Sequence, residues 1–365
     1  MSATPPIRFA LIGCGRIAFR HVEALREIPE ARLVAVCDLK SERAEAYAKE
    51  EGIPAYTNYH EMLSREEIDV VNIITPSGMH AEHALDVMRR YRKHVVVEKP
   101  MALRIEDAEE MIGTAEKEGV QLHVVMQNRF NKAVQKIREA VDENRFGRMV
   151  LGTVRLRWCR PQRYYDRDPW RGTWAFDGGA LTNQAVHHID LLQWMMGEVE
   201  EVSAAAQTRL VDVEVEDTAV AWLRFSNGAL GAIEATTAAR PDDFEASISL
   251  LGEHGTVVAE GASVNRITLW TFTDIDVEEF SEAPPNVYGF GHNVLLANVT
   301  DSVLGRARPL VDGLEGIKPL RLLHAIYSSI EQNARVRLDQ NPRSRRLGVL
   351  TEKDLPIRRL YISEP

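Results

Sequence analysis

The stretch Ile7–Ala18, IRFALIGCGRIA, decides the fold of the first third of the chain. Its apolar first half predicts a strand, and the glycine turn that follows opens a helix expected over Arg16–Ile28. Gly13 permits a tight turn, Gly15 lets the backbone approach a pyrophosphate, and Ala18 is small enough for close packing of helix on strand. The stretch therefore predicts a phosphate-binding strand–turn–helix unit.

An acidic residue follows where such a unit needs one. Asp38 directly follows a second apolar run, Leu33–Cys37, where a carboxylate can accept hydrogen bonds from ribose hydroxyls. The alternative is a plain glycine-rich turn in which Asp38 caps the next helix. Because a carboxylate repels a 2′-phosphate, Asp38 favours NAD over NADP, a preference that Lys40 and Arg43 soften.

Continuous apolar runs alternate with amphipathic stretches as far as residue 126. Apolar runs at Val70–Ile74, Val95–Val97 and Leu122–Met126 are separated by stretches at 79–91 and 105–117 that predict helices. Strands without polar alternation, interleaved with helices, are typical of a parallel sheet covered on both faces. We expect an α/β protein in which residues 1–126 form a Rossmann NAD-binding domain.

The pattern changes after residue 130. An alternating stretch at Val150–Trp158 and short strand-like runs from 202 to 272 are joined by turn sequences. Between them, an aromatic-rich loop, Cys159–Gly179, precedes a helix expected over Ala180–Met196. Residues 127–335 are therefore expected to form a second α/β domain for substrate binding and oligomerisation, with a large, mainly antiparallel open sheet.

Composition narrows the class of protein further. Lys and Arg number 44 against 54 Asp and Glu, a net charge of −10, which argues against a nucleic-acid surface. Three cysteines without metal-ligand spacing predict no disulfide framework and no metal site. The N-terminal apolar run is too short for a signal peptide or a membrane span, so we expect a cytoplasmic protein. Residues 336–365 form a basic C-terminal tail, expected to be a solvated, partly disordered arm, with contact to a partner subunit or an anion as the alternative.

Four stretches together resemble the Gfo/Idh/MocA oxidoreductases, the glucose–fructose oxidoreductase and inositol dehydrogenase group. They are the glycine turn at 13–18, Thr75–His80, Glu98-Lys99-Pro100 and Asp177–Asp190. The resemblance implies hydride transfer between NAD and a secondary hydroxyl of a sugar, cyclitol or sugar nucleotide, in a homodimer or homotetramer. Lys99 matches the family's active-site lysine and His187 its catalytic histidine. Where the family pattern has an aspartate this chain has Asn183, and where it has its first glycine this chain has Asp177.

The expected binding residues fall into two groups. Those expected to bind the cofactor are Gly13, Gly15, Arg16, Ile17, Asp38, Thr75, Pro76, His80, Glu98, Trp170 and Arg171. Those expected to contact the substrate are Arg129, Arg163, Tyr164 and Asn183. Arginine forks bind carboxylate or phosphate, and aromatic rings stack on sugar faces; the alternative for Tyr164 and Tyr165 is an aromatic plug. The aromatic loop and the N-Q-A-V-H sequence most resemble family members that act on UDP-N-acetyl-aminoglucuronate-type sugars.

Elementary chemistry supports the two central roles. Oxidation of a secondary alcohol requires removal of the hydroxyl proton, which suits a histidine such as His187. Lys99 follows the end of a predicted parallel strand, where ligands bind, and its ammonium can stabilise developing alkoxide charge. Positions 183, 187 and 190 share one face of the expected helix, so Asn183 should orient the substrate or the imidazole. The alternatives are an NAD-binding regulator without turnover and an NAD-dependent glycosidase that uses transient oxidation.

Overall fold

The computed structural model describes residues 5–273, 275–284 and 288–362, which divide into two compact units. The first unit comprises Met1–Val125, His292–Ile317 and Leu350–Pro365, and the second comprises Met126–Gly291 and Lys318–Val349. The first segment of the first unit ends at Val125, and the predicted domain boundary is at residue 126. The assignment of all of 127–335 to the second domain was wrong, because 292–317 belongs to the first unit.

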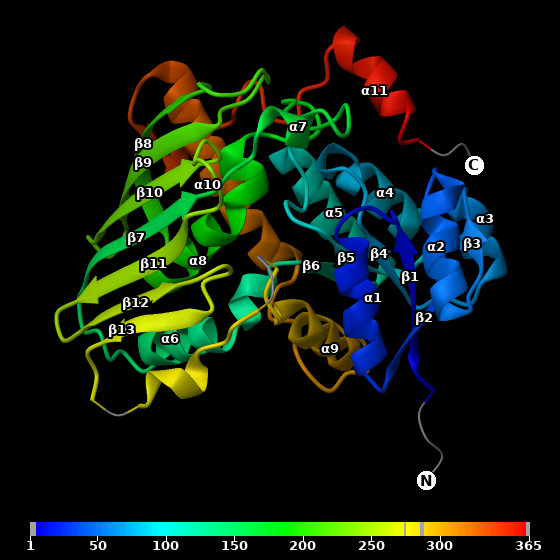
Figure 1. The fold of residues 1–365 in the computed structure, drawn as a ribbon, viewed down its shortest axis with the longest axis horizontal. Coiled ribbons are helices and arrows are strands. Elements are labelled where there is room, and N and C mark those ends of the chain that lie inside the picture. Colours follow the sequence, from blue (N-terminus) through cyan, green and yellow to red (C-terminus); the bar gives the residue numbers. More distant parts are fainter. Residues whose placement is uncertain (1–4, 274, 285–287, 363–365) are drawn as a thin grey trace. The chain divides into compact units, whose positions relative to one another are not determined.

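A six-stranded parallel sheet forms the centre of the first unit, in the order β3-β2-β1-β4-β5-β6 (Figure 1). The strands are β1 (Ile7–Ile12), β2 (Ala31–Cys37), β3 (Ala55–Tyr56), β4 (Val70–Ile73), β5 (His94–Val97) and β6 (Leu122–Val124). All four residues of β4 are buried, as a strand covered on both faces requires. The predicted Rossmann sheet is thus confirmed.

Helices connect these strands. They are α1 (Ala18–Glu27), α2 (Ser41–Glu51), α3 (Tyr59–Arg65), α4 (His80–Asp86), which a π-helical turn at Val87–Tyr91 extends, and α5 (Ile105–Glu118). The later helix α9 (Gly291–Val303) was not predicted. The segment after α9 covers the edge of the sheet, since the amide of Val124 donates to the carbonyl of Val311 at 3.1 Å. Among the described residues, no helix has the length and apolar character needed to cross a membrane.

The second unit contains an eight-stranded sheet in the order β13-β12-β11-β7-β10-β9-β8-β14. The strands are β7 (Met149–Arg157), β8 (Val199–Gln207), β9 (Thr218–Phe225), β10 (Leu230–Thr236), β11 (Glu245–Gly252), β12 (Thr256–Glu260), β13 (Arg266–Trp270) and β14 (Val336–Arg337). Every neighbouring pair is antiparallel except β7 and β10. The predicted large, mainly antiparallel sheet is confirmed.

One face of this sheet is covered by helices. The helices of the second unit include α6 (Lys132–Asp142), the short α7 (Gln162–Tyr165), α8 (Val186–Met196) and α10 (Gly313–Gln332), whose first residues belong to the first unit. Helix α8 packs on β7 and β11 (Figure 1). Gly152 of β7 is required there, because a Cβ at this position would lie 2.7 Å from the Met196 side chain.

The predicted C-terminal tail is built into both units. Val336 of β14 pairs with Val202 of β8, and Arg337 forms an ion pair with Glu200 at 2.9 Å. Further on, Arg358 of α11 (Leu355–Arg359) forms an ion pair with Glu82 at 2.9 Å. The expectation of a solvated, partly disordered arm is therefore wrong for the described residues of 336–365, because acidic groups on distant elements neutralise these arginines.

Candidate functional site

The carboxyl ends of four neighbouring strands gather most of the predicted cofactor residues at one edge of the first sheet. Ile12 of β1 is in register with Cys37 of β2 and Ile73 of β4, and Ile73 is in register with Val97 of β5. The residues that follow these strand ends within three positions are Gly13, Gly15, Asp38, Thr75, Pro76, Glu98 and Lys99. This is the edge at which open parallel sheets bind ligands.

The glycine turn has the shape that a pyrophosphate requires. Gly13 has a φ of +101°, and a Cβ there would lie 2.6 Å from the carbonyl oxygen of Ile74. A Cβ on Gly15 would have nothing within 4 Å, so the turn leaves open space next to the start of α1. Asp38 Oδ2 accepts a hydrogen bond from the amide of Cys14 at 2.7 Å, which holds the carboxylate next to the turn. These residues fit a dinucleotide with unsubstituted ribose hydroxyls.

The remaining residues of this group differ in exposure. Arg16 is exposed, and Ile17, Thr75 and Pro76 are half-buried. These four residues are therefore at least partly exposed, as contact with a cofactor requires.

His80 does not have the role expected from the sequence. Its ring nitrogens lie 2.8 Å from the carbonyl oxygen of Pro100 and 2.9 Å from that of Thr75, and only 1% of the residue is exposed. The imidazole therefore ties together the loops that follow β4 and β5. The structure gives His80 a positioning role in place of the predicted cofactor contact, because both of its polar atoms are taken up by backbone.

Glu98 is also enclosed by protein. Its Oε1 lies 3.0 Å from His21 Nε2 and 3.8 Å from His292 Nε2, and its Oε2 accepts a hydrogen bond from the amide of Lys99 at 3.2 Å. Although burial opposes a charge here, the two imidazoles hold the pKa of Glu98 well below its usual range. Metal-ligating atoms of these three side chains lie within 4.8 Å of one another. Since the Asn72 amide donates to His21 Nδ1 at 2.9 Å, the imidazole is neutral and its proton lies on Nε2. We interpret the group as a hydrogen bond from His21 to a buried carboxylate that also holds the backbone amide of Lys99.

In the second unit, the helix expected over Ala180–Met196 has two parts. A π-helical turn at Ala180–Gln184, in which the amide of Ala185 donates to the carbonyl of Ala180 at 2.8 Å, precedes α8. His187 and Asp190 lie three positions apart on α8, as expected, whereas Asn183 belongs to the wider turn that precedes it. Turns of this kind occur frequently at functional sites.

Asn183 pairs with the other substituted position of the family pattern. Its amide donates to Asp177 Oδ1, and Asp177 Oδ2 accepts a hydrogen bond from the amide of Gly172 at 2.7 Å. Asp177 is buried. The carboxylate that position 183 lacks is thus supplied by position 177, an arrangement that the sequence analysis did not recognise.

His187 and Arg129 are both buried in the second unit. His187 Nε2 lies 3.1 Å from the side-chain nitrogen of Gln127, which can only donate, so Nε2 is the acceptor. Arg129 donates to both carboxylate oxygens of Asp190, at 2.8 and 2.7 Å, and lies over the ring of Trp194. Arg129 is therefore a structural ion-pair partner, and the predicted anion contact is corrected: the carboxylate of Asp190 is the anion that it binds.

The aromatic loop is organised around Arg171. Its guanidinium lies 4.7 Å from the ring centroid of Tyr164 and 4.5 Å from that of Trp170. The Tyr164 hydroxyl accepts hydrogen bonds from Arg171 at 2.9 Å and from Gln184 at 3.3 Å, and burial raises its pKa. Arg163 is exposed. The loop is thus fastened to the π-helical turn, with one arginine stacked between rings and one open to solvent.

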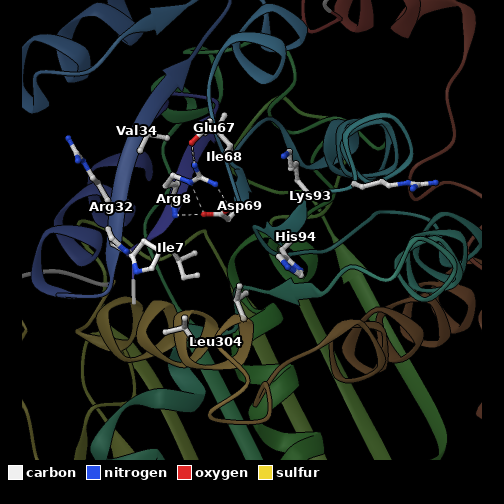
Figure 2. Close-up of a pocket in the computed structure, with 14 residues that line it drawn as sticks. Ile7, Arg8, Arg32, Val34, Glu67, Ile68, Asp69, Lys93, His94 and Leu304 are labelled. Carbon is white, nitrogen blue, oxygen red and sulfur yellow. Dashed lines mark hydrogen bonds and ion pairs between the residues drawn. The ribbon is translucent and has the colours of Figure 1, made fainter. Parts of the chain in front are cut away.

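A separate open pocket of about 730 Å³ lies at the opposite edge of the first sheet (Figure 2). It is lined by residues at or before the starts of β1, β4 and β5, among them Ile7, Asp69 and His94. Arg8 points across it to Asp69, with which it forms an ion pair at 2.9 Å. Because open parallel sheets bind dinucleotides at the carboxyl edge, we do not assign the cofactor to this pocket.

Known proteins resemble the chain over nearly its whole length. The family described as "Oxidoreductase family, NAD-binding Rossmann fold" matches residues 7–126, and the "GFO/IDH/MocA C-terminal domain" matches residues 134–258. Myo-inositol 2-dehydrogenase of Thermotoga maritima is 29% identical over 355 residues, which are 92% of this chain and 99% of that protein.

Solved structures show the same relationship. The WlbA dehydrogenase of Bordetella pertussis, in complex with NADH and UDP-GlcNAcA, is 41% identical, with a TM-score of 0.87 over 91% of this chain and 98% of its own. The WlbA dehydrogenase of Chromobacterium violaceum, in complex with the same two molecules, is 40% identical, with a TM-score of 0.85 over 92% of this chain and 99% of its own. Family matches to both parts of the chain agree with the Rossmann turn and with Lys99 at the carboxyl edge of its sheet. The chain is a member of the Gfo/Idh/MocA family and an NAD-dependent oxidoreductase.

Proposed function

We propose that this enzyme oxidises a secondary hydroxyl of a UDP-activated N-acetylated sugar acid. The observation that carries the proposal is the position of Lys99, two residues after the end of β5, at the same sheet edge as the glycine turn and Asp38. The substrate class is supported by two relatives, 40% and 41% identical over nearly their full lengths, whose structures contain NADH and UDP-GlcNAcA.

Lys99 would donate a hydrogen bond to the reacting hydroxyl. NAD, when bound, accepts the hydride from the carbon, and the oxygen gains negative character as its proton leaves. An ammonium next to that oxygen stabilises the developing charge. The hydrogen bond between the Lys99 amide and Glu98 and the buried imidazoles on Glu98 fix the backbone from which this ammonium extends.

His187 would take the hydroxyl proton. Its Nε2 already acts as an acceptor toward Gln127, so the imidazole can present a lone pair to a substrate hydroxyl that displaces or shares this contact. Asn183, held by Asp177, would orient the sugar through its amide. No charge at position 183 is needed for these roles.

The aromatic loop would contact the anionic parts of the substrate and the cofactor. Arg163 is exposed and can pair with a carboxylate or a diphosphate. The rings of Tyr164 and Trp170, between which Arg171 stacks, offer flat surfaces to a sugar or a base. We propose Arg163 and Tyr164 as substrate contacts, and Trp170 and Arg171 as contacts to the cofactor.

We also propose that the protein is a cytoplasmic homo-oligomer. Val220 and Leu230 on neighbouring strands of the second sheet are 51% and 46% exposed, which suits a face covered by another subunit. Cys14, Cys37 and Cys159 are free thiols, which suits a reducing compartment.

A nicotinamide-absorbance assay tests the activity. Wild type is offered UDP-N-acetylglucosaminuronate, UDP-N-acetylglucosamine, myo-inositol and glucose, each with NAD. We expect NADH formation with the first, and Lys99→Met or His187→Ala should lower kcat by about 10²- to 10⁴-fold. Lys93→Met is the matched control, because Lys93 lies before β5, at the opposite edge of the sheet. No NADH with the sugar acid, or full turnover by Lys99→Met, would contradict the proposal.

A further inference from the structure

The turn that carries Asn183 into α8 begins with backbone donors that need partners. The Ala180–Gln184 segment is π-helical, and the first amides of any helical segment have no acceptor within it. The hydroxyl and carboxyl side chains usual at a helix start are absent from its cap position, which is Gly179. The partners must therefore come from elsewhere in the second unit.

Glu216, which lies just before β9, supplies two of these partners. Its main-chain carbonyl accepts a hydrogen bond from the amide of Ala180 at 3.0 Å. Its side-chain Oε1 accepts one from the amide of Leu181, also at 3.0 Å. A distant glutamate thus takes the place of a helix cap. A Cβ on Gly179 would clash with the same carboxylate, which explains the glycine.

Tyr327 of α10 completes the contact. Its hydroxyl donates to Glu216 Oε1 at 2.9 Å and lies 2.9 Å from Thr182 Oγ1, which must then be the donor in their hydrogen bond. The amide of Gly179 also points to this hydroxyl, at 3.4 Å. Burial raises the pKa of Tyr327 well above its usual range, so the phenol keeps the proton that it donates.

Burying the carboxyl group of Glu216 beside this turn opposes folding. Glu216 is buried, and its Oε2 accepts no hydrogen bond from any described residue. Burial, together with the nearby carboxylate of Asp177, raises the pKa of Glu216 to about 7. The titratable groups around it are Asp177 and Tyr327. Ordinary packing does not require a buried carboxyl group, which suggests that the shape of the turn depends on it.

We propose that Glu216 is a positioning residue, which with Tyr327 holds the Gly179–Gln184 turn in the shape that Asn183 and His187 need. The expected effect on kcat rests on the proposed function. The expected effect on the backbone of the turn does not. Glu216 touches neither substrate nor cofactor in this account. It acts through the backbone of the turn.

Steady-state kinetics and hydrogen exchange test this proposal. Glu216→Leu and Tyr327→Phe should lower kcat by about 10- to 100-fold, since a small misplacement of catalytic groups has effects of that size. The KM for NAD should change less than kcat, because the glycine turn and Asp38 belong to the first unit, away from the Gly179–Gln184 turn. Glu216→Gln keeps an Oε1 acceptor and should restore kcat to within about threefold of wild type. The controls are Glu201→Leu, a buried glutamate on β8, and Ser329→Ala, a buried hydroxyl on α10.

Hydrogen exchange separates the two proposals because it needs no substrate. The amides of Ala180 and Leu181 should exchange faster in Glu216→Leu than in wild type, and at the wild-type rate in the controls. This result would support the role of Glu216 even if wild type oxidised none of the sugars. Unchanged exchange at these amides, or a kcat loss that Glu216→Gln does not restore, would overturn it. If Glu216→Leu does not fold, Tyr327→Phe decides: unchanged exchange in that variant would also overturn it.

Discussion

Breaking the Arg129–Asp190 pair from one side should cost far more stability than removing both partners. The two side chains are each 2% exposed and share two hydrogen bonds of 2.8 and 2.7 Å. Arg129→Met therefore leaves a carboxylate buried without its counter-charge, and we expect a loss of about 3–5 kcal/mol in the free energy of unfolding. In the double variant Arg129→Met/Asp190→Leu no charge is buried, and we expect a stability within about 1 kcal/mol of wild type or above it.

Urea unfolding followed by tryptophan fluorescence measures these differences, and the double-mutant cycle isolates the pairwise energy. Trp194 lies 4.8 Å from the Arg129 guanidinium, so its emission reports on this region. Arg148→Met is the matched control: Arg148 also donates twice to one carboxylate, that of Glu253, but it is 86% exposed, so its loss should cost less than about 1 kcal/mol. An Arg129→Met cost no larger than this, or a double variant as unstable as the sum of both single variants, would refute the reasoning.

Three more outcomes are expected. Gly13→Ala should abolish NADH binding in fluorescence titrations, because the added Cβ would lie 2.6 Å from the carbonyl oxygen of Ile74; binding at wild-type affinity would contradict this. Asp38→Ser should raise the affinity for NADP relative to NAD by about tenfold or more in the same titrations, since the carboxylate that repels a 2′-phosphate is gone; an unchanged ratio would argue against that role. Burial raises the pKa of Glu216 from 4.5 to about 7, so the folded state binds more protons between these values and wild type loses stability as pH rises through them. Urea unfolding at pH 4.5 and pH 8 should show that Glu216→Gln escapes this loss, which is about 3 kcal/mol at most, and equal losses in both proteins would exclude the effect.

The elements of both sheets could be predicted wherever local pattern determines them. The bounds expected at Val70–Ile74, Val95–Val97 and 105–117 agree with β4, β5 and α5 to within one residue, because each is a short apolar or amphipathic run between strong turn signals. The position of 292–317 could not be predicted in this way. Its helix, α9, returns to the first unit, where His292 lies against His21 of α1, and nothing in the local sequence shows to which unit a returning segment belongs.

The basic tail illustrates the same limit in terms of charge. Counting residues showed an excess of arginine after position 335, which is typical of a solvated arm. In the structure Arg337 faces Glu200, and Arg346 lies 4.3 Å from the ring of Trp174. These partners are far away in the sequence, so a local count of charges contains no information about them.

Motifs predicted the residue types at the site better than their partners. The glycine turn, Asp38 and Lys99 lie where the motif predicts, because each follows the end of a parallel strand and the parallel register brings these ends together. The motif does not reveal that His292, which comes from the returning segment, lies 3.8 Å from Glu98. A buried carboxylate in a cofactor motif is a signal that a cationic or hydrogen-bonding partner must exist somewhere in the chain.

The two departures from the family pattern, Asp177 and Asn183, are explained by their contact with each other. Taken alone, Asn183 indicates a lost charge and Asp177 indicates a glycine replaced without reason. In the structure Asn183 donates to the Asp177 carboxylate, which also accepts a hydrogen bond from the amide of Gly172. The carboxylate is therefore kept just before this turn, where it holds the amide of Gly172 in the aromatic loop and orients the amide of Asn183. Because an amide both donates and accepts, whereas a carboxylate only accepts, the exchange changes which groups position 183 can hydrogen-bond, while Asp177 keeps an anion next to it.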